Sequence, residues 1–186
     1  MKRWKPLALA LGLALLVVPV GAAIQAMSLY EYMNVTNETL HGTIVSKETF
    51  KSDYPDVGTV YTRLVVEGDA WRSEKPMTTE VVYMGSHDPK DRYFVSEMPE
   101  FRDVRVGNEV IVFWGEDERL AGGARVIWNL SGVYRIERGF GEPVVIGKGE
   151  GFAFVENIKL DDARSRVRST HALIEAEKQA QPHDHK

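Results

Sequence analysis

The chain contains no cysteine among its 186 residues. Disulfide bonds and lipid attachment at a cysteine are therefore excluded, and stability has to come from burial of a core and from hydrogen bonds. The length is sufficient for one domain with a proper core and is short for two. We therefore expect a single domain.

Positive charge is scarce outside the first 26 residues. That segment holds Lys2, Arg3 and Lys5 and no acidic residue, so the remainder has 20 basic against 27 acidic residues. A chain with this acidic balance is poorly suited to gripping phosphate backbones or anionic lipid heads. We expect no nucleic-acid partner, and membrane contact only through the N-terminal segment if that segment is not cleaved.

One long apolar run is present, and it lies at the N-terminus. The three basic residues precede "PLALALGLALLVVPVGAAIQAM", which carries no charge and has small residues near its end. This is the layout of a secretory signal peptide over residues 1–26. The alternative is an uncleaved membrane anchor, because the run is as long as a membrane span. Either reading places the rest outside the cytoplasm, as a periplasmic or secreted protein or as one anchored in the inner membrane and facing the periplasm.

The middle of the chain consists of short β-type runs that end in turn-forming residues. "LHGTIVSKETF" and "GTVYTRLVVEGDAWR" form a predicted hairpin, and "TTEVVYMG", "RYFVSEM", "NEVIVFWG", "ARVIWNL", "GVYRIERG" and "EPVVIG" follow. Eight such runs with no helical period between them predict a mainly β fold, either a small antiparallel OB-like β-barrel or a β-sandwich. The nearly continuous apolar run in "NEVIVFW" predicts a strand that is central or buried on both faces.

The two ends of this β domain differ from it in pattern. Residues 27–39 show no clear period and are expected to be a linker or an edge segment before a β-barrel domain at residues 40–158. Residues 159–180 contain good helix formers, and Leu160, Ala163, Val167 and Ile174 follow helical spacing. The pattern predicts a solvated C-terminal helix that packs loosely, followed by a disordered tail at residues 181–186.

The stretch "VVIGKGEGFAF" is the strongest candidate for a ligand-binding motif. A phosphate loop needs glycine-rich backbone at the start of a helix and a lysine followed by Ser or Thr. Here Glu150 would repel a phosphate, and "FAFV" has the pattern of a strand. Gly147, Gly149 and Gly151 are instead expected to lie on one face of an extended segment, at a bulge, a barrel corner or a close backbone approach.

The remaining polar residues form no convincing catalytic or metal site. Ser86, His87 and Asp88 are adjacent, whereas the members of a catalytic triad meet through the fold, so a polar turn is the preferred interpretation. His183 and His185 lie in the tail, where a solvated terminus is commoner than a metal site. We therefore predict no catalytic residue, no cofactor and no metal ligand.

Aromatic residues occur throughout the predicted strands, and core packing explains them best. An aromatic platform for single-stranded nucleic acid would have the same residues but would also need a basic groove. The aromatics in question are Tyr61, Trp71, Tyr83, Phe94, Phe113, Trp114, Trp128 and Tyr134.

The order of these segments resembles a group of small exported bacterial proteins of unknown function. "HGTIVS" and "TRLVVEGDAW" fit the first half of the group's pattern, and "MPEFRDVRVGNEVIVFW" followed by "GVYRIERGFGEPVVIGKGEGFAF" fits the second. The resemblance covers Leu40 to Val155. It implies an OB-like or small β-barrel domain with an accessory or binding role outside the cytoplasm, and it brings no catalytic residues.

Two functions follow as hypotheses. The first is an exported, non-enzymatic accessory or binding protein of the bacterial envelope that recognises a protein or an envelope component. The second is a hydrolase in which His87 meets Asp88, Glu109 or Glu116 in the fold.

Overall fold

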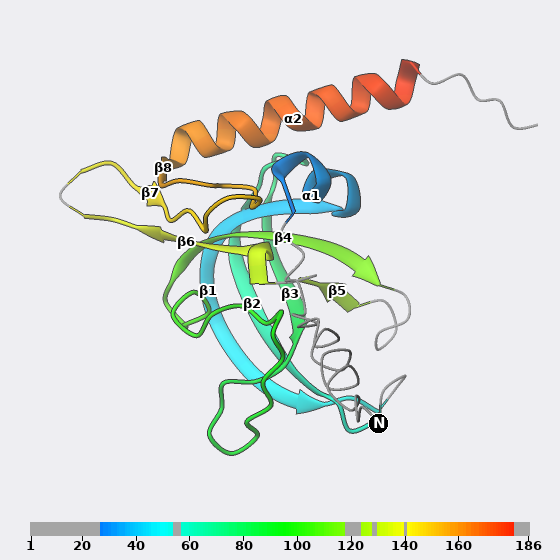
Figure 1. The fold of residues 1–186 in the computed structure, drawn as a ribbon, viewed down its shortest axis with the longest axis vertical. Helices are drawn as coiled ribbons and strands as arrows, with labels where there is room; N and C mark the ends of the chain where they lie inside the picture. Colours follow the sequence, from blue (N-terminus) through cyan, green and yellow to red (C-terminus); the bar gives the residue numbers. More distant parts are fainter. Residues whose placement is uncertain (1–26, 54–56, 118–123, 128–129, 140, 181–186) are drawn as a thin grey trace, which may run out of the picture.

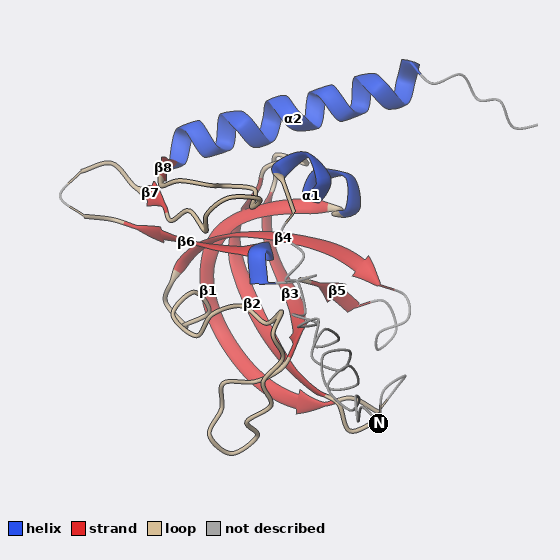
Figure 2. Cartoon of the chain, viewed as in Figure 1, coloured by secondary structure: helices blue, strands red, loops and turns tan. Residues whose placement is uncertain are grey.

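The computed structural model describes residues 27–53, 57–117, 124–127, 130–139 and 141–180. Two helices and eight strands make up this part of the chain (Figures 1 and 2). The helices are α1 (Leu29–Val35) and α2 (Leu160–Ala180), and a short 3-10 turn, η1, spans Leu130–Gly132. The strands are β1 (Glu38–Lys51), β2 (Val60–Ala70), β3 (Pro76–Met84), β4 (Glu109–Asp117), β5 (Ala124–Val126), β6 (Val133–Glu137), β7 (Val144–Val145) and β8 (Ile158–Lys159).

Five of the strands close into a barrel. The order runs β1, β2, β3, β5, β4 and returns to β1, because the long first strand pairs with both β2 and β4. Neighbours in the barrel are antiparallel except β3 and β5, which pair in parallel through Val82 and Val126. The sequence prediction of a small OB-like β-barrel with a C-terminal helix is confirmed.

Two glycines allow β1 and β2 to pass very close to each other. Gly42 lies directly opposite Gly68 in the pairing of these strands. A Cβ atom built on Gly68 would lie 2.0 Å from the carbonyl oxygen of His41 and 2.4 Å from the Cα of Gly42. Glycine in a strand often marks such a backbone approach. The contact lies in the part of β1 that pairs with β2 and β4 at once.

The barrel interior forms one of two hydrophobic cores. Side chains from all five barrel strands or their flanking loops fill it, and two of its members come from the loop between β3 and β4. Its buried residues are Leu40, Ile44, Leu64, Val66, Val81, Tyr83, Met98, Val104, Val110, Val112, Trp114, Ile127 and Val133.

A second core lies outside the barrel. On one side it is formed by β4 and β6, and on the other by a layer that consists of α1, α2 and residues 144–160. Ile111 and Phe113 of β4 belong to this core, while Val110 and Val112 of the same strand belong to the barrel interior. Strand β4 is therefore buried on both faces, as the run "NEVIVFW" predicts. Helix α2 crosses above this layer in Figure 1.

The segment expected as a linker at residues 27–39 contains helix α1 instead. The Ser28 hydroxyl accepts a hydrogen bond from the Glu31 amide, and the Glu31 carboxylate accepts one from the Ser28 amide, which makes a reciprocal capping box. Tyr32 and Met33 are buried in the second core, and the Tyr32 hydroxyl lies 2.7 Å from that of Ser131. The helix is seven residues long, which is too short for its period to stand out in the sequence.

Helix α2 packs more firmly than expected. The four apolar positions that define its stripe, Leu160, Ala163, Val167 and Ile174, are all buried in the second core. The stripe itself is predicted correctly, but the loose packing is wrong, because α1 and residues 144–158 supply a surface for it. The expected signal segment at residues 1–26 and the tail at residues 181–186 lie outside the described residues.

We predict that Gly68→Ala destabilises the protein by about 2 kcal/mol or more, because the new methyl group overlaps backbone atoms that cannot move without opening the barrel. Denaturant unfolding measures the change. The matched control is Gly139→Ala, where a Cβ atom meets nothing within 4 Å. Equal stability of the two variants would contradict the proposed tight approach.

Candidate functional site

The loop between β3 and β4 is the longest connection in the described part of the chain. It comprises residues 85–108 and contains no strand. Loops longer than about 15 residues without secondary structure are uncommon in compact domains and are usually functional. In Figure 1 the lower part of this loop extends away from α2, and the loop then returns along the barrel to the start of β4.

The barrel anchors this loop at several points. Met98 and Val104 are buried in the barrel interior, so the loop closes one end of the barrel. Near its end, the Gly107 amide donates to the carbonyl of Ile44, and the Ile44 amide donates to the carbonyl of Asn108. "RYFVSEM" is therefore not a strand, and its one ladder contact is the bridge from Tyr93 to Ser86. Within this segment Met98 fills the end of the barrel, and Phe94 lies on the surface of the loop.

Three rings form a row on the outside of this loop. The His87 ring meets the rings of Phe94 and Phe101 edge-on, with centroids 6.1 and 5.4 Å apart. His87 Nε2 is fixed by the carbonyl oxygen of Pro99 at 2.9 Å. Phe94 is 66% exposed and Phe101 is 49% exposed. Large aromatic side chains this exposed are informative when they lie together.

Three cations accompany these rings. The ammonium of Lys47, from β1, and the guanidinium of Arg105 lie 5.1 and 4.9 Å from the centroid of Phe101. Arg92 lies 5.9 Å from the centroid of Phe94. Among the described residues, none of these three cations forms an ion pair. We call this set the cation–ring cluster: Lys47, His87, Arg92, Phe94, Phe101 and Arg105.

The electrostatics of the cluster favour an anionic ligand. Partial burial lowers the pKa of Lys47, attraction by the Asp88 carboxylate opposes this, and repulsion from Arg105 adds to it as the smallest of the three effects. Lys47 and Arg105 are therefore like charges on one ring, and Asp88 is the nearby counter-charge of Lys47. A ligand carboxylate that contacts Arg105 would offset the remaining repulsion.

The residues of the hydrolase hypothesis have other contacts. The buried Ser86 hydroxyl lies 2.9 Å from that of Thr49 and accepts a hydrogen bond from the Asp88 amide, as in a polar turn. Glu109 contacts His41 and Arg138. Glu116 lies seven residues farther along β4, which is roughly 23 Å at about 3.3 Å per residue. The described contacts of His87 include none of these carboxylates.

The glycine-rich loop performs a structural task. Lys148 does not point to solvent: its ammonium lies 2.8 Å from the Asp103 carboxylate and 2.7 Å from the Leu130 carbonyl oxygen. The side chains of both ion-pair partners are less than a tenth exposed. This buried pair ties the loop between β3 and β4 to the second layer.

The backbone of the same segment differs in part from the prediction. A Cβ atom at Gly147 would come within 2.4 Å of the Glu156 backbone, so a close backbone approach is confirmed there. Gly149 and Gly151 have φ values of 101° and 86°, which make a turn rather than one face of an extended segment. The expected strand at "FAFV" is also wrong, because residues 148–155 fold back through backbone hydrogen bonds.

A second polar group lies where β1 and β4 pair. Arg138 binds the Glu109 carboxylate with two hydrogen bonds of 2.5 and 2.6 Å, and the His41 ring lies 2.8 Å from the same carboxylate. These contacts, led by the hydrogen bonds from Arg138, lower the pKa of Glu109. Glu109 is thus kept ionised, which suits an ion pair and not a general acid.

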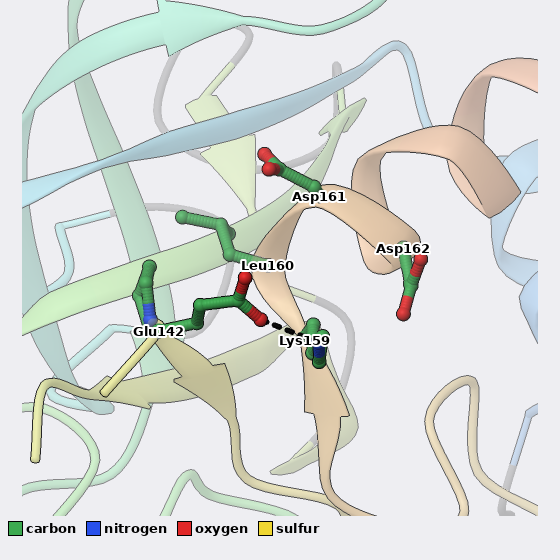
Figure 3. A pocket seen from close by; sticks show the side chains of 6 residues that line it. Glu142, Lys159, Leu160, Asp161 and Asp162 are labelled. Atoms are coloured by element: carbon green, nitrogen blue, oxygen red, sulfur yellow. Dashed lines mark ion pairs between the residues drawn. The ribbon is translucent and has the colours of Figure 1, made fainter. Parts of the chain in front are cut away.

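A shallow pocket of about 240 Å³ lies at the start of α2. Figure 3 shows the Lys159 and Glu142 side chains paired across it, with Asp161 and Asp162 on the first turn of the helix. Its charged side chains are exposed, and the basic group, Lys159, is already taken up in the ion pair with Glu142. Within the described ranges, no three His, Asp or Glu side chains are grouped to hold a metal ion. No helix in those ranges is long and apolar enough to cross a membrane.

Comparisons with known proteins add no relative from which a role could be transferred. No family model, no curated protein and no solved structure matches the chain. The function must therefore be argued from the residues themselves.

Sequence reasoning placed Phe94 in the core and did not single out Phe101, Lys47, Arg92 or Arg105. Six of the eight aromatics expected in the core are indeed buried, and Trp128 lies outside the described residues. Phe94 is the exception. The signal that could have found the cluster is the density of Phe and Arg in "RYFVSEMPEFRDVR", which is unusual for a loop.

We predict that Lys148→Met lowers the free energy of unfolding by about 1.5–3 kcal/mol, because the buried Asp103 carboxylate loses the hydrogen bond from its closest cation and keeps only the guanidinium of Arg135, 3.7 Å away. Chemical denaturation measures the loss. The control Lys159→Met breaks an exposed pair with Glu142 and should cost less than about 1 kcal/mol. Adding Asp103→Asn to Lys148→Met should restore part of the loss, and a fully additive loss would count against the pair.

We also predict that Glu109→Gln is less stable than the parent chain at pH 7 but not in acid. A carboxylate with a lowered pKa stabilises the folded state above its unfolded value, about 4.3, and this contribution disappears as the pH falls through the folded pKa. Both chains should carry His41→Asn, so that the measured difference reports on the contact between Glu109 and Arg138. Urea unfolding at a series of pH values measures the difference in stability between the two chains. A difference that stays the same from pH 7 into acid would contradict the role of the ion pair with Arg138.

Proposed function

We propose that this chain is an exported, non-enzymatic accessory or binding protein of the bacterial envelope, and that it recognises a protein or an envelope component through the cation–ring cluster. The observation that carries the proposal is the cluster itself: three cations without ion-pair partners among the described residues, arranged on exposed rings. Phe, like the other large aromatic residues, and Arg are enriched in the buried centres of interfaces between proteins.

The architecture supports a binding role. The OB-like barrel is closed by the same loop that carries the rings, so the cluster rests on a packed core rather than on a free loop. Barrels of this class use their surfaces and loops to bind ligands. The Lys148 to Asp103 ion pair fixes the backbone between Phe101 and Arg105, which limits the entropy lost on binding.

The export part of the proposal rests on the basic and apolar pattern of residues 1–26. The chain should be found in the periplasmic or secreted fraction with a mass that shows loss of about this segment. An intact mass in the inner-membrane fraction would favour the anchored alternative, and a cytoplasmic location would contradict export.

Capture from the envelope and secreted fractions tests recognition. We expect the purified protein to retain a specific component at a defined stoichiometry, and the variant Lys47→Gln/Arg92→Gln/Arg105→Gln to lose it. The control Lys51→Gln/Lys90→Gln/Arg102→Gln removes the same charge from nearby exposed positions. Equal capture by all three proteins would reject the cluster as the binding surface, and capture of nothing specific by any of them would reject the binding role.

A further inference from the structure

We propose that the cation–ring cluster binds an acidic peptide segment of a partner protein, in which carboxylates pair with Lys47, Arg92 and Arg105 and an apolar side chain packs beside Phe94 and Phe101. This inference rests on the proposed function and names its ligand class. It follows from the positions of the three cations and from the ring surfaces that these cations and His87 already cover.

The cations are arranged to receive carboxylates. A guanidinium that lies over a ring keeps its N–H donors at its edge, where they can make paired hydrogen bonds to a carboxylate. Arg92 and Arg105 are exposed, and each lies over a different ring. Lys47 adds a third positive charge from β1, on the same ring as Arg105. Because the cations lie on two different rings, a segment needs two or more carboxylates to pair with all of them.

The rings are poorly placed for stacking on a base or a sugar. Two cations already lie over the Phe101 ring, and the His87 ring meets its edge. Phe94 has Arg92 over it and His87 beside it. Stacking platforms for single-stranded nucleic acid present open ring faces. The exposed parts of Phe94 and Phe101 are better suited to contact with an aliphatic side chain.

The loop also argues against a broad anionic surface such as a lipid bilayer. Its cations are interspersed with carboxylates, and Asp88, Asp91, Glu97 and Glu100 lie in the same 24-residue loop. A membrane surface would bring negative charge to all of these residues together, and the chain outside the N-terminal segment is itself net negative. A narrow peptide covers a smaller part of the loop than a bilayer does, and it therefore brings its negative charge near fewer of these carboxylates.

The test uses the purified protein and a short fluorescein-labelled peptide of Glu, Asp and Leu. The matched peptide has Gln and Asn in place of Glu and Asp. We expect the acidic peptide to bind by fluorescence anisotropy, the matched peptide to bind far more weakly, and the affinity to fall as ionic strength rises.

Two variants of the same loop then locate the site. Arg105→Gln should weaken the peptide by about ten-fold or more, because it removes a charged hydrogen-bonding group from the cluster. Arg102→Gln removes one positive charge three residues away, from a side chain that pairs with Glu100, and should change the affinity by less than about two-fold. Both side chains are exposed, and equal unfolding midpoints should show that both variants fold.

The outcomes separate this inference from the broader function. An equal loss in both variants would mean general charge attraction and would overturn the site. Binding of polygalacturonate or of phosphatidylglycerol vesicles, with dependence on Arg105 and without binding of the peptide, would overturn the peptide class and leave a binding role in place. No binding of any probe would overturn the inference, while envelope capture would still decide the proposed function.

Discussion

Closure of the barrel depends on one constraint: β1 must pair with β2 on one side and with β4 on the other. The strand is 14 residues long and has to curve strongly to do so. Facing glycines at positions 42 and 68 and a register shift between Ile44 and Ser46 accommodate that curvature. The same bend brings Ile44 to the loop that plugs the barrel and brings Lys47 to Phe101. The position of the cluster is therefore a product of barrel closure.

Strand β4, which pairs with β1, is the second element on which the architecture depends. Because β4 is buried on both faces, it separates a barrel interior from an outer layer built by α1, α2 and the glycine-rich segment. Without cysteine, these two cores and their hydrogen bonds hold the chain together. The outer layer makes the C-terminal helix part of the fold, since Ile174, near its far end, is as buried as the side chains of its first turns.

The sequence predicts those features that depend on periodic burial. The apolar run of β4, the stripe on α2 and the first hairpin are all visible as patterns, and each corresponds to a buried face. Features set by tertiary contacts are not visible. Helix α1 is too short to show a period, and "RYFVSEM" has strand composition but fills the end of the barrel and covers its surface.

The candidate site follows the same division. Single residues such as Phe94 and Arg105 have no sequence pattern that says whether they will be buried, and their grouping depends on how a long loop returns over β1. The sequence argues against both a phosphate loop and a catalytic triad. For the phosphate loop the structure adds a reason, because the Lys148 ammonium is buried in an ion pair with Asp103. The cation–ring cluster, on which the proposed recognition rests, could not be predicted from the sequence.

The buried pair of Asp103 and Lys148 separates two kinds of position in this loop: those that the fold constrains and those that are free to change. Asp103 lies between Phe101 and Arg105 in the chain, but its side chain points inward to a partner from a distant segment. Substitution at 103 or 148 alone breaks a buried ion pair and therefore lowers the stability of the fold. Positions 101 and 105 face outward on a backbone that this pair holds in place. The proposed recognition surface can thus change without a change of fold.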